Sequence, residues 1–224
     1  NGNCFRYNWA KENCGLPRNM LREAVAPEYQ ALGALDEFRY SLELDKKKIG
    51  YQREVPFRKE TKNSVILGRM DFVLEDGTIV EKKSSSSERI LKSCIEGGVP
   101  EPSHIAQLAT YLAMNDTPNG LLVVTYYEYD PEVRGFIVCA EREFSVQVSD
   151  NRVLRVDGTP YPYSLKDLAR WYAEYAKNVS DPSTLPPLPK MSTKAFENPC
   201  FFCPLKDFCH DTQEVEQYLQ KTKE

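Results

Sequence analysis

The sequence predicts an α/β fold in which helices flank one central mixed β-sheet. Strand-like segments alternate with amphipathic helices, an order typical of an α/β or α+β protein built on a single sheet. The 224 residues, 41% hydrophobic and 28% charged, can bury the core of one domain with an appended element. No run of about 18 apolar residues occurs, so we expect no membrane span or membrane partner. We expect a cytoplasmic protein, in the host cytoplasm if it is viral.

Hydrophobic periodicity places the elements. Apolar residues at three- and four-residue spacing predict a first helix over 17–42. Two later helices are predicted at 104–114 and 164–179, the second with Ser164 as its N-cap. Strands are predicted at 50–58, 65–75, 78–84, 121–129 and 135–148.

The connections suggest two parts of the chain. Residues 1–180 are expected to form the core, and the proline-rich stretch 181–190 is expected to be a linker. Residues 181–224 comprise that linker and a final segment rich in cysteine. The stretch 87–103 is too long for a tight turn, and we expect it to shape the entrance to a site.

The sequence GRMDFVLEDGTIVEKK, from Gly68 to Lys83, predicts a β-hairpin whose turn length decides which side chains meet. With a two-residue turn, Asp71 and Glu81 would lie on opposite faces of the sheet. With a three-residue turn, Gly77 takes the left-handed position and Asp71 lies opposite Glu81, about 5 Å away. Lys83 then shares the face of Glu81, because strand side chains alternate with period two.

Facing carboxylates repel each other unless a cation lies between them. A hard divalent ion such as Mg²⁺ or Mn²⁺ prefers oxygen ligands and binds phosphate as well. A neighbouring lysine can orient a water molecule and stabilise charge at phosphorus. The three-residue turn therefore predicts a site for phosphodiester hydrolysis, whereas the simpler alternative is an exposed, charged end of a strand.

This hairpin resembles the signature of the PD-(D/E)xK nucleases, with Asp71, Glu81 and Lys83 at its aspartate, glutamate and lysine. Gln107 and Tyr111, four residues apart on the following helix, look like the QxxxY element of RecB-type nucleases; otherwise they are surface and core residues. The resemblance implies a restriction-endonuclease-like fold. Where that family usually has a histidine, this chain has Asp36 and Glu37, and either could complete the metal site.

Three of the seven cysteines are close together, with the spacing C-x2-C-x5-C: Cys200, Cys203 and Cys209. Such a group favours a metal or cluster site over disulfides. The chain resembles the fourth family of CRISPR-associated (Cas) nucleases and the AddB nuclease domains, in which one early and three late cysteines hold a [4Fe-4S] cluster. Cys4 matches the early ligand and Cys14 is its rival; zinc is the competing metal. The resemblance implies that the C-terminal segment folds back on the N-terminus.

The other two cysteines, Cys94 and Cys139, are most simply thiols without a role.

These features predict a metal-dependent DNA nuclease, which the resemblance makes an exonuclease acting on single-stranded ends. The net charge of −4 argues against non-specific coating of nucleic acid, so local basic residues would contact phosphate. Our candidates are Arg69, Lys82, Arg89 and Lys92. The alternative is a catalytically quiet DNA-binding or scaffolding subunit. A helicase or a CRISPR-adaptation protein would be a separate partner.

Overall fold

A computed structural model describes residues 9–10, 27–60, 65–149 and 152–179 of the 224-residue chain. The chain divides into two compact units, one made of Asn1–Val25 with Arg170–Glu224 and the other of Ala26–Ala169. The sheet and the helices between residues 27 and 114 belong to the second unit, which is described here by itself; the last described helix, Leu165–Val179, begins in the second unit and continues into the first. The predicted linker at 181–190 and the C-terminal cysteine segment lie outside the described residues.

The predicted helices and strands that fall within the described residues occur in the predicted order, and four shorter elements are additional. The helical elements are α3 (Pro27–Lys47), α4 (Glu88–Ile90), the π-helix η1 (Leu91–Glu96), α5 (Pro102–Met114) and α6 (Leu165–Val179). The strands are β1 (Tyr51–Glu60), β2 (Val65–Leu74), β3 (Ile79–Ser85), β4 (Asn119–Asp130), β5 (Gly135–Val148), β6 (Leu154–Val156) and β7 (Thr159–Pro160).

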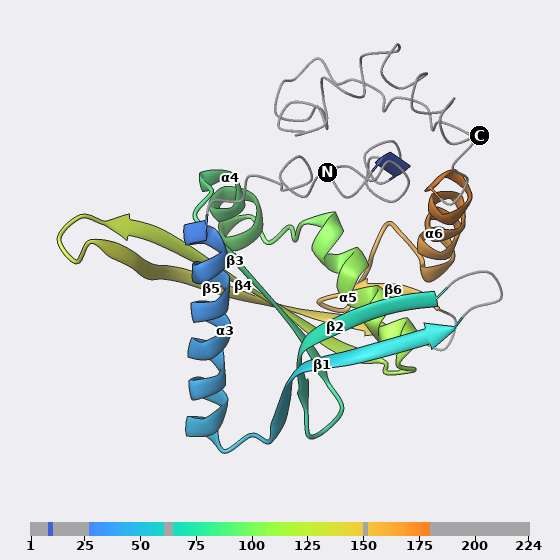
Figure 1. Ribbon diagram of the computed structural model, residues 1–224, viewed down its shortest axis with the longest axis horizontal. Helices are drawn as coiled ribbons and strands as arrows, with labels where there is room; N and C mark the ends of the chain where they lie inside the picture. Colours follow the sequence, from blue (N-terminus) through green and yellow to red (C-terminus); the bar gives the residue numbers. More distant parts are fainter. Residues whose placement is uncertain (1–8, 11–26, 61–64, 150–151, 180–224) are drawn as a thin grey trace, which may run out of the picture. The chain divides into compact units, whose positions relative to one another are not determined.

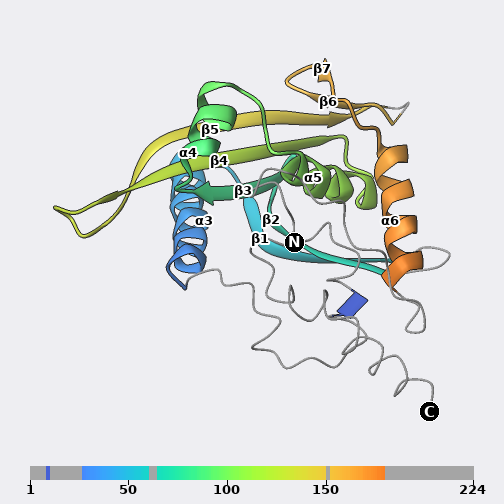
Figure 2. The same cartoon turned by 90° about the horizontal axis from the view of Figure 1, so that it is seen from above.

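The seven strands form one mixed sheet in the order of the chain, from β1 at one edge to β7 at the other (Figure 2). All neighbouring strands are antiparallel except β3 and β4, which are parallel. A parallel pair needs a crossover, which α4, η1 and α5 supply here. The mixed sheet with flanking helices confirms the predicted α/β class.

Two buried clusters lie on opposite faces of the sheet. Ile79 packs with Ile105, Leu108 and Leu112 of α5, whereas its neighbour Val80 belongs to the cluster that contains residues of α3. Consecutive strand residues point to opposite faces, so α5 covers one face and α3 the other. Four buried positions of α3 recur every four residues, at Leu32, Asp36, Tyr40 and Leu44, and one of these four is a carboxylate; Ser41 is buried as well.

Two helical predictions need correction or completion. The first helix continues to Lys47, five residues beyond its predicted end, because buried Leu44 extends the apolar face; residues 17–26 lie outside the described part. The stretch 87–103 is largely helical, because Ile90 and Cys94 are anchored in the core below α5. The stretch is thus longer than a tight turn, as expected; its role at the entrance to a site stays a prediction.

The prediction for α6 is confirmed at its start, where Ser164 and Asp167 form a reciprocal cap. Ser164 Oγ accepts from the Asp167 backbone N–H at 3.3 Å, and Asp167 Oδ2 accepts from the Ser164 backbone N–H at 2.9 Å. This arrangement satisfies donors that the first helical turn leaves unpaired.

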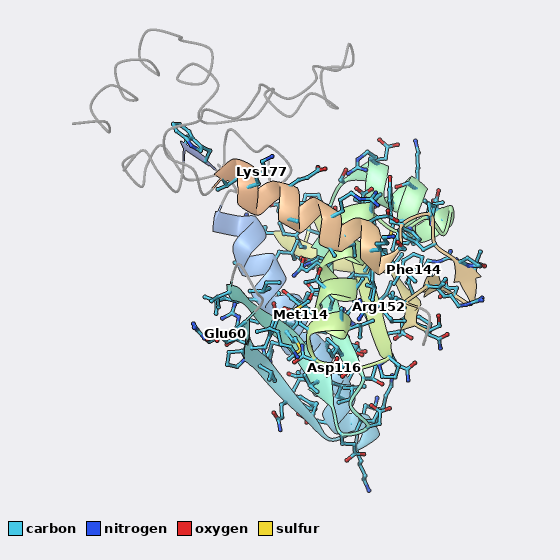
Figure 3. The ribbon with its side chains drawn as sticks, turned by 90° about the vertical axis from the view of Figure 1, so that its right-hand side faces the viewer. Glu60, Met114, Asp116, Phe144, Arg152 and Lys177 are labelled. Carbon is cyan, nitrogen blue, oxygen red and sulfur yellow. The ribbon has the colours of Figure 1, made fainter. Side chains whose placement is uncertain are left out.

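The hairpin of β4 and β5 extends well beyond the other strands (Figure 1). At the other end of the sheet, the β1–β2 hairpin reaches the carboxyl end of α5, where Lys59 Nζ lies 3.4 Å from Asp116 Oδ2. Figure 3 labels Glu60, the last residue of β1, and Asp116, which follows α5. Within the described residues, no helix has both the length and the apolarity that a membrane crossing requires.

Candidate active site

The turn between β2 and β3 has three residues, Glu75, Asp76 and Gly77. Leu74 donates its N–H to the Thr78 carbonyl at 2.9 Å and accepts one from Gly77 at 2.9 Å, which closes the turn. Gly77 has φ of 84°, in the left-handed region that glycine adopts without a Cβ clash. The longer of the two turns considered for the sequence is therefore the one observed.

This turn sets the register of the hairpin. Phe72 pairs with Val80 and Val73 with Ile79, so the next step along the strands brings Asp71 opposite Glu81. Regular pairing of β2 with β3 ends at Phe72, and the Asp71 carboxylate takes over by accepting the Lys82 backbone N–H at 2.8 Å. The two strands therefore separate at the acidic pair.

Strand β2 also bends at Asp71. Met70 belongs to the core cluster beneath α5, whereas Phe72 belongs to the cluster beneath α3. Residues two apart share a face in a regular strand, so the strand must rotate between them. Since the pairs between β2 and β3 end at Phe72, the part of β2 before this residue is not paired with β3.

Glu81 is fully buried, and its Oε1 is ion-paired with Lys83. Burial raises the pKa of Glu81 to about 7; the positive charge of Lys83 opposes this rise and the negative charge of Asp71 adds to it. Burial also raises the pKa of Asp71, although its bond from the Lys82 N–H acts in the other direction. The second oxygen, Glu81 Oε2, is buried and accepts no hydrogen bond from the described residues.

The structure distinguishes the two acidic residues of α3. Burial, followed by the charge of Asp71, raises the pKa of Glu37, which places Glu37 in the electrostatic field of the pair. Its side chain is 26% exposed and lies 3.7 Å from Arg53. Asp36 instead is buried on the α3 face, where Oδ1 accepts from Arg39 and Tyr127 and Oδ2 lies 3.3 Å from Lys82 Nζ without a hydrogen bond among the described residues.

The expectation that Lys82 contacts phosphate is wrong. Its side chain is 1% exposed and lies on the α3 face, where its Nζ pairs with Asp36 and Glu141. The sequence places Lys82 between Glu81 and Lys83, and the period-two alternation turns it away from them. A buried, doubly paired ammonium offers no surface to DNA.

The donor chemistry fits a hard divalent cation. Asp71, Glu81 and Glu37 supply carboxylate oxygens, and the unpartnered Glu81 Oε2 is a buried acceptor that an oxygen-preferring cation would satisfy. Among the described residues, no three His, Cys, Asp or Glu side chains are already gathered closely enough to hold a metal ion. A cation at Glu81 Oε2 would lie beside the ion pair that Oε1 makes with Lys83.

Gln107 and Tyr111 are brought together as their spacing suggests. Gln107 Nε2 donates to Tyr111 Oη at 2.9 Å, and the Tyr111 ring packs edge-on against Phe57 at 5.3 Å between centroids. A Cβ on Gly68 would lie 2.2 Å from the Phe57 ring and 3.1 Å from Tyr111, so glycine is needed where these rings approach β2. Tyr111 therefore packs close to β2, the strand that carries Asp71.

His104 is a further residue near the site, which the sequence analysis did not select. Burial, followed by the positive charge of Lys83, lowers the pKa of His104 to about 4, so the ring is neutral near pH 7. Its Nδ1 is buried without a hydrogen-bond partner among the described residues. The sequence could have indicated His104 as a site residue, because it lies three residues before Gln107 and so on the same face of the helix.

The remaining predicted phosphate contacts lie at the surface. Arg69 is 3.3 Å from Glu54, Arg89 is 2.5 Å from Glu101, and Lys92 is 2.6 Å from Glu88. Each is an exposed pair that water screens, so DNA could displace it at little cost. Their role in binding stays a prediction.

The cysteine predictions are largely outside the described residues: Cys4, Cys14, Cys200, Cys203 and Cys209. The two described cysteines are free thiols, with Cys94 buried and Cys139 exposed.

The fold and the acidic hairpin together define an α/β domain with a mixed sheet and a candidate cation site at its centre. The crystal structure of SSO0001 is similar to this chain with a TM-score of 0.53 and 17% identity, over 92% of this chain and 80% of the other. At that identity the likeness concerns the fold. A structure of an alkaline exonuclease (LHK-Exo) from Laribacter hongkongensis matches 66% of this chain and 68% of its own, with a TM-score of 0.42 and 12% identity. Comparisons with protein families and with curated proteins give no match.

Proposed function

We propose that this protein is a metal-dependent DNA nuclease of the PD-(D/E)xK type, an exonuclease that acts on single-stranded ends. The observation that carries the proposal is the three-residue turn, which puts Asp71 opposite Glu81 with Lys83 on the same strand. A buried carboxylate pair without a cation is costly, and a divalent ion removes that cost.

Asp71, Glu81 and Glu37 bind Mg²⁺ or Mn²⁺ in this proposal. The metal, when bound, neutralises charge on the scissile phosphate and makes water a better nucleophile. Lys83, released from Glu81, orients the attacking water and stabilises the negative charge that develops on the phosphate. Gln107 and Tyr111 position the DNA strand beside β2, and Arg69, Arg89 and Lys92 contact its phosphates.

The cysteine spacing and the family resemblance support a [4Fe-4S] cluster held by Cys200, Cys203, Cys209 and either Cys4 or Cys14. A cluster that joins Cys4 or Cys14 to three cysteines near the other end of the sequence would close a very long loop and stabilise the folded chain. Broad visible absorbance of protein purified without air, lost in Cys203→Ser, supports the cluster. A colourless wild type that contains zinc contradicts it.

The nuclease proposal is tested by incubating end-labelled single-stranded DNA with Mn²⁺ and either the wild type or Glu81→Ala. We expect the wild type to release short products from the end and the variant to lose at least about a hundredfold in rate. Lys59→Ala, which removes an exposed charge beside Asp116, is the matched control and should cleave like the wild type. Equal rates for wild type and Glu81→Ala would refute the site.

A second candidate is a DNA-binding or scaffolding subunit without catalysis. The ion pairs of Glu81 with Lys83 and of Glu37 with Arg53 favour it, since both occupy carboxylates that the metal needs. This candidate predicts binding of single-stranded DNA that neither Mn²⁺ nor Glu81→Ala changes. A helicase or a CRISPR-adaptation protein would then be the active partner.

A further inference from the structure

A buried polar network lies on the α3 face of the sheet, behind the carboxylates. Its centre is Lys82, whose Nζ is 3.3 Å from Asp36 Oδ2 and 3.1 Å from Glu141 Oε2. The same ammonium donates to Thr125 Oγ1 at 3.0 Å and lies 4.8 Å from the centroid of the Tyr40 ring. The Lys82 and Asp36 side chains are each 1% exposed.

Asp36 is held from other directions as well. Tyr127 donates its hydroxyl to Asp36 Oδ1 at 2.8 Å, and Arg39 donates to the same oxygen at 3.0 and 3.2 Å. Arg39 is also ion-paired with Glu141. Burial acts against ionisation of Glu141, but Lys82, Thr125 and Arg39 outweigh it and lower the pKa of Glu141. The network therefore links α3, β3, β4 and β5.

Each member of the central ion pair is adjacent in sequence to a residue of the candidate site. Asp36 precedes Glu37 on α3, and Lys82 lies between Glu81 and Lys83 on β3. The Lys82 backbone N–H also holds the Asp71 carboxylate at 2.8 Å. The ion pair between α3 and β3 thus lies next to the backbone that carries Glu37, Glu81 and Lys83, and the Lys82 N–H connects Asp71 of β2 to the same strand.

Stability alone does not account for this arrangement. Removing a lysine and an aspartate from water carries a desolvation penalty, and well-packed apolar residues often replace such a pair without loss. Apolar Val80 and Val123 already pack on this face. An ion pair with several hydrogen bonds, unlike apolar packing, fixes one geometry between helix and strand.

We propose that Lys82 is a positioning residue: its ion pair with Asp36 sets α3 against β3 so that Glu37 can join Asp71 and Glu81 on one divalent cation. This inference rests on the proposed function. It assigns to Lys82 the control of the third ligand, in place of the phosphate contact that its sequence position suggested.

The test is a double-mutant cycle on the full-length protein, read out as Mn²⁺ binding by calorimetry and electron paramagnetic resonance in the absence of DNA. Lys82→Met keeps the length of the side chain and removes its charge, and we expect Mn²⁺ to bind about tenfold more weakly. In a Glu37→Gln background, Lys82→Met should cause no further loss, because the ligand that Lys82 positions is already missing.

Leu154→Ala is the control for general destabilisation, because Leu154 is a buried residue of β6, three strands away from β3. It should lower the melting temperature and leave Mn²⁺ affinity unchanged. If Lys82→Met does not fold, Asp36→Asn takes its place in the cycle, since it keeps the shape of the partner and removes the charge.

The outcomes separate the two proposals. The proposed function requires that the wild type binds Mn²⁺ and that Asp71→Asn abolishes this binding. If the wild type shows no such Mn²⁺ site, the proposed function is refuted. Wild-type affinity in Lys82→Met, or an equal loss with and without Glu37, would refute the positioning role alone.

Discussion

Replacing Glu81 by glutamine should stabilise the folded protein in the absence of metal. Burial raises the pKa of Glu81 from its ordinary value of 4.5 to about 7, so at neutral and higher pH the fold carries an ionised carboxylate that it disfavours. A pKa difference of this size corresponds to about 3 kcal/mol. This value already includes the opposing effect of Lys83.

The sign follows from proton binding. Between pH 4.5 and about 7, the unfolded chain has released the proton of Glu81 while the folded chain keeps it, so the free energy of unfolding falls as pH rises through this interval. Glutamine stays neutral at every pH. Glu81→Gln should therefore exceed the wild type in stability by about 3 kcal/mol at pH 8 and by little near pH 4.5.

Urea unfolding in the presence of EDTA, followed by far-ultraviolet circular dichroism, measures this difference because the signal changes when the helices and the sheet are lost. The control is Glu132→Gln, an exposed position outside the core that should leave the stability curve unchanged at both pH values. A Glu81→Gln variant no more stable than the wild type at pH 8 would refute the assigned burial cost. It would also remove one reason to place a cation at this site.

Two further changes test the turn and the helix beside the site. Gly77→Ala should lower the free energy of unfolding by about 1–2 kcal/mol, because φ is 84° and no atom lies within 4 Å of the added Cβ, so the cost is conformational. Gly158→Ala is the control, because Gly158 has φ of 77° and equally open surroundings, so urea unfolding should show the same loss of stability. Gly77→Ala should weaken Mn²⁺ binding, whereas Gly158→Ala should leave it intact. Equal Mn²⁺ affinity in both variants would contradict the role of the turn. Tyr111→Phe keeps the ring against Phe57 and removes the bond from Gln107, so fluorescence anisotropy should show weaker binding of single-stranded DNA with a stability loss of only about 1 kcal/mol. Unchanged DNA affinity would make the pair purely structural.

The hairpin shows what local sequence can predict. The offset between Asp71 and Glu81 depends only on turn length and strand alternation, but Gly77 suits both turn lengths, so the sequence left two registers open and the structure decided between them. The helix with Gln107 and Tyr111 was predictable, because four-residue spacing fixes their common face.

Contacts between distant elements could not be predicted in this way. The bend at Asp71 depends on how Met70 and Phe72 pack against two different helices, and no spacing rule records it. The burial of Lys82 has the same origin, since it depends on Asp36 in α3 and Glu141 in β5. A charged residue in the middle of a central strand was a signal, but its partners lie too far away in sequence to be identified.

The parallel pairing of β3 with β4 has a consequence for how the chain folds. The hairpin of β2 and β3 forms from near neighbours in sequence, whereas β4 reaches β3 only after the crossover through α4, η1 and α5. Until Leu122 and Val124 pair with Glu81 and Lys83, water still reaches the glutamate from that side. The dry surroundings that raise the pKa of Glu81 are therefore complete only when residues 119–124 have been synthesised and have paired with β3. Proton uptake by Glu81 would mark the completion of the sheet.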